Sequence, residues 1–242
     1  MNLSEVSNLR PVECANCAMR RMCLPEGLDD GNLQQFNQVI LRRFRTLRRE
    51  PVYRSGDPVG ETLYVVRVGG VKTCHGGVDQ QQVTGFHMSG EMLGLEALPG
   101  ASHDGSALAL EDSEICAISY PRLERLCDVV TPLRRHFHTL LMDEIRREQR
   151  VSAMLRNSRA DQRFAAFLLD LSARYAARGY SSTRFRLTMS RQEIGDFLGL
   201  TAESISRLLR NFRSAQLVAV ERRQVLLNDM PGLRALAQGA AY

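Results

Sequence analysis

The chain has 242 residues, of which 44% are hydrophobic and 24% charged, as in a globular protein with room for two domains. No apolar run approaches the roughly 20 residues of a membrane helix, and the N-terminus lacks a signal-peptide core. These absences exclude a membrane span and lead us to expect a cytoplasmic protein with no membrane partner.

The net charge of +5 is unevenly distributed. Residues 159–242 contain 13 arginines against 7 acidic residues, whereas residues 1–158 contain 19 basic against 20 acidic residues. The last third of the chain is therefore expected to bind a polyanion. A solvated basic surface is the alternative.

Residues 1–30 are predicted to form an irregular, cysteine-rich arm. Its cysteines, Cys14, Cys17 and Cys23, follow a C-x2-C-x5-C pattern. In a reducing compartment such residues are ligands, reactive thiols or buried small residues rather than disulfides. Thiolates at this spacing can surround one soft metal centre, but spacing alone does not separate zinc from an iron–sulfur cluster.

Residues 31–130 are predicted to form a sensor domain that begins with a helix. Apolar residues keep helical spacing over 31–45, namely Leu33, Phe36, Val39, Ile40 and Phe44. Over residues 47–120, short alternating runs separated by glycine-containing turns indicate an all-β barrel or sandwich.

Three further cysteines fall in or near this β region. Cys116 lies in a strand-like run, where it is either a fourth ligand for the arm or a buried small residue. Cys74 and Cys127 stand alone, and we interpret both as structural.

Residues 131–158 are predicted to be one long helix, because they contain no glycine and Pro132 can occupy a helix start. A narrow apolar stripe runs along this helix and is interrupted by the acidic Glu148. Its apolar members are Phe137, Leu140, Leu141, Ile145, Val151 and Leu155. Such a stripe favours a coiled-coil dimer contact, with packing against the chain's own barrel as the alternative. An acid in the stripe would face its symmetry mate and weaken that dimer.

Residues 159–242 contain the most specific motif. Ser190 and Glu193 form a capping box that starts a helix, Gly199 supplies a turn, and Thr201 caps a second helix. The second helix is amphipathic, so the unit has the pattern of a helix-turn-helix and predicts DNA binding. Ser190 and Thr201 are also candidate DNA contacts.

The outward face of the second helix carries residues suited to base readout. Arg207 can donate two hydrogen bonds to guanine, Glu203 can accept one from cytosine, and Ser206 can contact a base or a phosphate. Arg210 and Arg213 are better placed for phosphates. For each residue taken singly, a solvated helix face is the alternative.

The order of barrel, long helix and helix-turn-helix resembles the CRP/FNR superfamily, and its oxygen-sensing branch, the fumarate and nitrate reduction regulators (FNR), matches best. The resemblance covers nearly the whole chain. It rests on the cysteine pattern with Cys116, QVTGFH at 82–87, FRLTMSR at 185–191 and GLTAESISRLL at 199–209. It implies an α+β fold with an N-terminal β-roll of the cyclic-nucleotide-binding jelly-roll type, a long dimerisation helix and a C-terminal winged helix-turn-helix.

The resemblance also implies a function for the sites. An oxygen-labile [4Fe–4S] cluster would be held by Cys14, Cys17, Cys23 and Cys116. Glu203, Ser206 and Arg207 match base-reading residues that recognise palindromic TTGAT-type half-sites in double-stranded DNA. Glu148 falls where the family places an acid, usually Asp, that keeps the cluster-free protein monomeric. The loop 76–81 falls where the family contacts RNA polymerase, although its residues differ.

Nucleotide-binding relatives carry a Glu and an Arg where this chain has Leu95 and Gly105, which implies that no cyclic nucleotide is bound. A regulator of the same fold could instead sense nitric oxide or a small molecule, or hold structural zinc. A redox or electron-transfer protein is disfavoured by the helix-turn-helix and by the lack of a nicotinamide or flavin fingerprint. No reaction on a substrate is implied, so we do not expect an enzyme.

Overall fold

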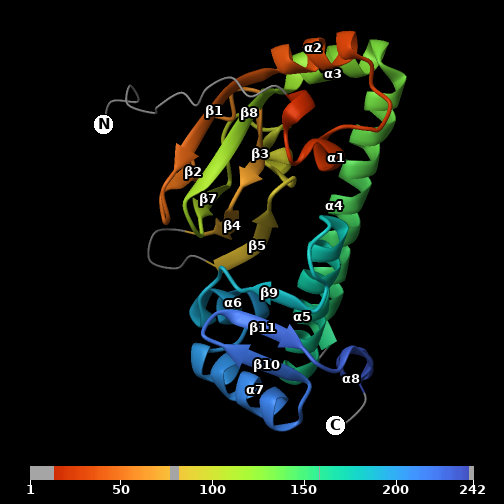
Figure 1. The fold of residues 1–242 in the computed structure, drawn as a ribbon. Helices are drawn as coiled ribbons and strands as arrows, with labels where there is room; N and C mark the ends of the chain where they lie inside the picture. The colour runs from red at the N-terminus through yellow and green to blue at the C-terminus, as the bar shows by residue number, and fades with distance from the viewer. Residues whose placement is uncertain (1–13, 77–81, 158, 240–242) are drawn as a thin grey trace. The chain divides into compact units, whose positions relative to one another are not determined.

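The structure is a computed structural model that describes residues 14–76, 82–157 and 159–239. The chain divides into two compact units, residues 1–143 and 144–242 (Figure 1). The boundary falls inside the long helix α4, Thr131–Asn157, which corresponds to the helix expected at 131–158. Within the described ranges, no helix is long and apolar enough to span a membrane.

The first unit begins with three short helical elements, η2 (Cys14–Asn16), α1 (Arg20–Cys23) and α2 (Asp30–Val39). Asp29 caps α2 by accepting a hydrogen bond from the Asn32 amide at 2.7 Å. The arm therefore contains short helices and is not wholly irregular.

The helix predicted over residues 31–45 is wrong beyond Val39, because Ile40 has extended dihedrals and begins strand β1 (Ile40–Thr46). Ile40 and Phe44 are four residues apart, which satisfies the helical period and the two-residue period of a strand equally. Pairing with β8 selects the strand, and Phe44 is buried between the sheets.

The body of the first unit consists of two four-stranded antiparallel sheets, as the sequence predicted for an all-β region. One sheet has the order β1, β8 (Ser113–Ser119), β3 (Thr62–Val68) and β6 (Met92–Leu93). The other has the order β2 (Pro51–Tyr53), β7 (Gly105–Ala109), β4 (Gly70–His75) and β5 (Gln82–Met88). Fully buried side chains fill the space between the sheets, among them Val66, Val71, Ala107 and Ile115.

Helices cover one end of this β-roll. Helix α3 (Tyr120–Val129) follows β8 and packs against α2, as Figure 1 shows. The short turn η3 (Leu95–Ala97) follows β6. The buried core under these helices includes Cys14, Cys116 and Cys127, so the cysteine arm is part of the packed unit.

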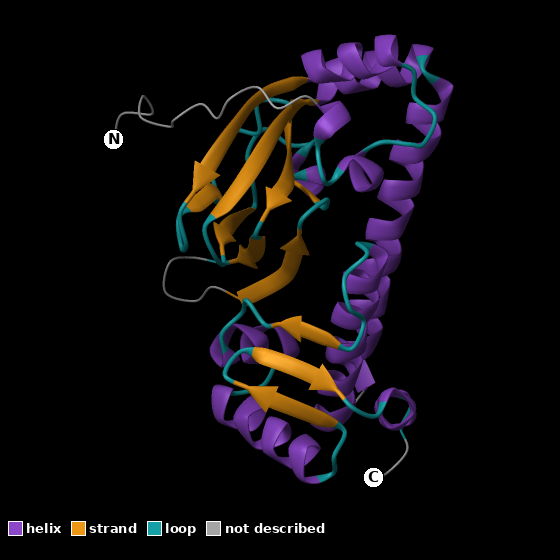
Figure 2. Cartoon of the chain, in the orientation of Figure 1, coloured by secondary structure: helices purple, strands orange, loops and turns teal. Residues whose placement is uncertain are grey.

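The second unit is a winged helix-turn-helix. Its elements are α5 (Ala160–Ala177), β9 (Arg184–Arg186), α6 (Arg191–Leu198), α7 (Ala202–Ser214), β10 (Val218–Glu221), β11 (Gln224–Leu227) and α8 (Met230–Ala237) (Figure 2). Strands β10 and β11 form an antiparallel hairpin, and β9 extends it to a three-stranded antiparallel sheet. The rings of Phe164 and Phe212, 5.4 Å apart, fix α7 against α5 in the core.

Candidate cysteine centre and nucleic-acid interface

Three neighbouring cysteines of the arm and one distant cysteine of the β-roll line one cavity of the first unit. Cys14 and Cys17 belong to the turn at η2, Cys23 ends α1, and Cys116 lies in the middle of β8. The cavity wall is otherwise mainly apolar and includes Leu24, Phe36, Val65, Ile118, Leu123 and Phe137. Cys14 and Cys116 are each only 9% exposed. The two remaining cysteines, Cys74 and Cys127, are buried elsewhere and do not line this cavity.

Backbone hydrogen bonds hold the cysteine arm in place. The Cys14 amide donates to Asn37 Oδ1 of α2 at 3.0 Å, and the Cys17 amide donates to the Cys14 carbonyl at 3.2 Å. The Cys23 amide donates to the Met19 carbonyl at 3.1 Å. The C-x2-C spacing therefore corresponds to one tight helical turn, which presents both thiols to the same cavity.

Two arginines reach the thiols. Arg43 Nη2 donates to Cys14 Sγ at 3.6 Å, and Arg67 lines the same cavity as Cys17. Burial raises the pKa of the Cys14 and Cys116 thiols, and the positive charge of Arg43 is the largest opposing effect on each pKa. A cavity of this kind disfavours isolated thiolates unless a cation or a metal stabilises them.

The thiols are the potential metal ligands of this cavity. No group of three or more His, Cys, Asp or Glu side chains in the described ranges is arranged to hold one metal ion. The donor set around the cavity is sulfur, which iron–sulfur clusters use. The buried Nε atoms of Arg43 and Arg67 have no hydrogen-bond partner in the described part of the chain. Arg67 is paired with Glu114 through another nitrogen, so the unsatisfied Nε of Arg43 is the stronger indication of a negatively charged group in the cavity.

The helix-turn-helix has the local geometry that the sequence predicted. Ser190 Oγ accepts from the Glu193 amide at 3.2 Å, and Glu193 Oε2 accepts from the Ser190 amide at 2.7 Å. Gly199 has φ +64°, a left-handed conformation that favours glycine. Thr201 Oγ1 accepts from the Ser204 amide at 3.1 Å and caps α7.

A small residue is required where α6 and α7 approach each other. A Cβ atom on Gly195 would lie 2.5 Å from the Leu200 carbonyl oxygen, which is closer than van der Waals contact allows. On α7 the apolar face is buried, namely Ile205, Leu208, Leu209 and Phe212. This packing fixes which face of α7 is left for solvent or DNA.

The predicted DNA-reading residues share that outer face. Glu203, Arg207, Arg210 and Arg213 are exposed, and Ser206 is half-buried. Ser206 Oγ donates to the Ala202 carbonyl at 2.8 Å and accepts from Arg191 Nη1 at 3.1 Å. Arg191, the first residue of α6, was not among the predicted site residues. Its position directly after the helix cap Ser190 was the sequence feature that could have placed it near the start of the motif.

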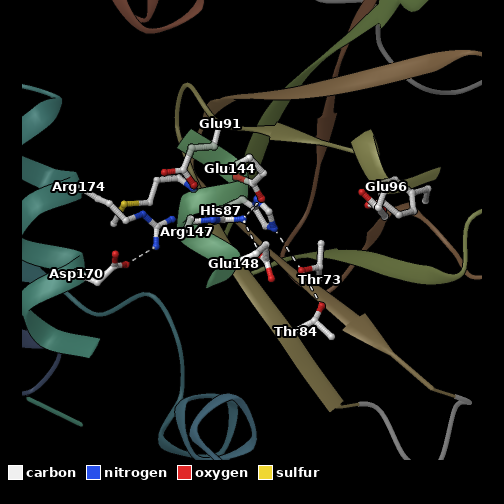
Figure 3. Close-up of polar contacts among 12 residues, drawn as sticks. Thr73, Thr84, His87, Glu91, Glu96, Glu144, Arg147, Glu148, Asp170 and Arg174 are labelled. Atoms are coloured by element: carbon white, nitrogen blue, oxygen red, sulfur yellow. Dashed lines mark hydrogen bonds and ion pairs between the residues drawn. The ribbon is translucent and has the colours of Figure 1, made fainter. Parts of the chain in front are cut away.

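The stripe on α4 is partly uncovered. Ile145 is 50% exposed and Leu155 36% exposed, whereas Phe137, Leu140, Leu141 and Val151 are half-buried. The side chain of Glu148 is 59% exposed and lies 3.7 Å from Arg147, which also pairs with Glu144 (Figure 3). Packing within the chain therefore leaves part of the stripe and its acid accessible.

Comparison with known proteins identifies the family. Residues 43–129 match the model of the cyclic nucleotide-binding domain, and residues 162–236 match that of the Crp-like helix-turn-helix domain. The transcriptional regulatory protein btr of Bordetella pertussis is 41% identical over 224 residues, 92% of each chain. The chain belongs to the CRP/FNR family of transcription regulators.

Further relatives indicate which branch of the family the chain resembles. The fumarate and nitrate reduction regulatory protein of Vibrio cholerae is 35% identical over 229 residues, which cover 93% of this chain and 90% of the relative. The structure of FixK2 from Bradyrhizobium japonicum has a TM-score of 0.72 and 29% identity, and it covers 82% of this chain and 98% of FixK2. These matches confirm the predicted fold and an FNR-type regulator with a DNA-binding helix-turn-helix.

Proposed function

We propose that this CRP/FNR regulator senses oxygen through a [4Fe–4S] cluster held by Cys14, Cys17, Cys23 and Cys116. The observation that carries the proposal is the convergence of three arm cysteines and one barrel cysteine on a single, mainly apolar cavity. When bound, the cluster would supply a centre that molecular oxygen destroys. The thiols of the arm and of β8 would then be fixed together only in the absence of oxygen.

The same cavity is also lined by the start of the long helix α4. A change in the arm can therefore affect the helix that carries the proposed dimer contact. Leu133, His136, Phe137 and Leu140 of α4 line the cavity beside the cysteines. His136 Nε2 lies 3.3 Å from the Met22 carbonyl oxygen of the arm. We infer that fixing the arm at Cys116 repositions the start of α4, because these packed side chains have to move together.

We further propose that the stripe on α4 forms a homodimer contact. A second copy would cover the exposed Ile145 and Leu155, and the two Glu148 carboxylates would approach each other. Their repulsion would keep the cluster-free protein monomeric until the cluster stabilises the dimer.

Replacing Glu148 with alanine is expected to raise the dimer fraction of cluster-free protein, because the repulsion between the paired carboxylates is removed. Sedimentation velocity at several protein concentrations measures that fraction. Asp143, an exposed acid on the same helix that lies outside the stripe, provides the matched control in an Asp143→Ala variant, which should keep the wild-type dimer fraction. An apo monomer fraction that is the same in wild type and the Glu148 variant would contradict this role.

In the proposed dimer, two α7 helices lie about 34 Å apart, one turn of DNA, and read the half-sites of a palindromic TTGAT-type site. Binding to such a duplex by protein kept without oxygen tests the function. We expect binding to fall after exposure to air, and to be weak in both conditions on a duplex with scrambled half-sites. Equal binding before and after air would contradict the oxygen switch.

A contact with RNA polymerase was expected at loop 76–81, of which residues 77–81 lie outside the described residues. A cyclic nucleotide is not proposed as the signal, because Leu95 and Gly105 replace the family's Glu and Arg. At Gly105 even a Cβ atom would lie 2.6 Å from the Cys74 carbonyl oxygen, so the backbone there leaves no space for an arginine.

A further inference from the structure

Arg43 connects a cysteine of the arm to the cysteine of the barrel. It lies on β1 directly opposite Cys116 of β8, and residues that face each other in this way project from the same side of a sheet. Its Nη2 atom donates to Cys14 Sγ at 3.6 Å, and its positive charge opposes the rise that burial causes in the pKa of the Cys116 thiol. One side chain therefore contacts one of the proposed cluster ligands and lies across the sheet from another.

The charge of Arg43 has no carboxylate partner in the ranges that the structure describes. Its Nε atom is buried without a hydrogen-bond partner. Arg67, the other arginine near the thiols, differs because it forms an ion pair with Glu114. Arg43 as a whole is half-buried, but a buried Nε donor without an acceptor is unfavourable, and an anion in the cavity would satisfy it.

We propose that Arg43 is a positioning residue that binds the sulfur atoms of Cys14 and Cys116 and offsets the negative charge of the cluster. This inference rests on the proposed function. Hydrogen bonds to the sulfur atoms and the net charge around a cluster set its reduction potential. Arg43 therefore raises the potential and slows the loss of the cluster in air.

The test uses full-length protein loaded without oxygen with iron and sulfide, as wild type, Arg43→Gln, Arg43→Lys and Arg45→Gln. Three quantities are measured: iron per chain, the midpoint reduction potential, and the rate at which visible absorbance disappears in aerated buffer. Arg45 is the matched control, because it lies two residues further along β1 and its side chain is 66% exposed.

Arg43→Gln is expected to lower the potential and to accelerate cluster loss about 10-fold, the size of effect typical for residues that orient metal ligands. Arg43→Lys should be intermediate, because it keeps the charge but not the planar fork needed to bind two sulfur atoms. Arg45→Gln should match wild type.

The outcomes separate this inference from the proposed function. Wild-type protein that takes up no iron contradicts both. Wild-type protein that holds a cluster, beside an Arg43→Gln variant with unchanged potential and loss rate, contradicts only the role of Arg43. Thermal unfolding of each cluster-free variant checks its folding. If Arg43→Gln does not fold, the Arg43→Lys variant provides the test. A reduction potential and a rate of cluster loss equal to those of wild type in that variant would overturn the inference.

Discussion

Alanine in place of Arg207 is expected to weaken binding to the specific palindrome by about 1–3 kcal/mol for each half-site, the usual value of a bidentate contact to guanine. Arg207 is exposed on the outer face of α7 and makes no hydrogen bond within the described part of the chain. The substitution should therefore leave the stability of the domain almost unchanged and act on DNA binding alone. Fluorescence anisotropy with a labelled duplex measures the loss.

Arg213→Ala is the matched comparison, because Arg213 is also exposed on α7 but is placed for a phosphate. It should weaken binding to specific and scrambled duplexes alike and reduce the salt dependence by about one charge. The Arg207 variant should lose affinity mainly for the specific duplex. An equal loss on both duplexes would show that Arg207 does not read a base.

Alanine in place of Cys116 is expected to abolish cluster binding, because β8 supplies the only one of the four proposed ligands outside the arm. The protein should still fold, since alanine is smaller than cysteine and the side chain is a buried, uncharged part of the sheet. Iron per chain should fall to background in protein purified without oxygen, and DNA binding should no longer respond to air.

Cys74→Ala is the control for this substitution. Cys74 is also buried in a strand of the β-roll, at 3% exposure, but it does not line the cavity. This variant should keep its iron and its response to air. Full iron content in the Cys116 variant would remove Cys116 from the ligand set and leave the arm to bind metal without the barrel.

The features that the sequence predicted best depend on local chemistry. The capping box at Ser190, the turn at Gly199 and the cap at Thr201 each involve residues within a few positions of one another, and each has its predicted geometry. The long helix could be placed for the same reason. The strand that begins at Ile40 could not be predicted, because its apolar spacing fits both the helical period and the two-residue period of a strand. Pairing with the distant strand β8 determines that the segment is a strand.

The cysteine centre depends on tertiary structure. Its spacing left zinc, a cluster and a buried small residue as alternatives, and the resemblance to a family, rather than the spacing, singled out Cys116. Arg43 was not predicted, because its place beside Cys14 and Cys116 follows from the register between β1 and β8. That register cannot be derived from the local sequence of either strand.

The most direct test of oxygen sensing is the iron and acid-labile sulfide content of wild-type protein purified without oxygen, measured again after exposure to air. We predict roughly four of each per chain, as a [4Fe–4S] cluster requires, and their loss in air together with DNA binding. Zinc in their place, or no metal and unchanged DNA binding, would contradict oxygen sensing and leave a transcription regulator that responds to another signal.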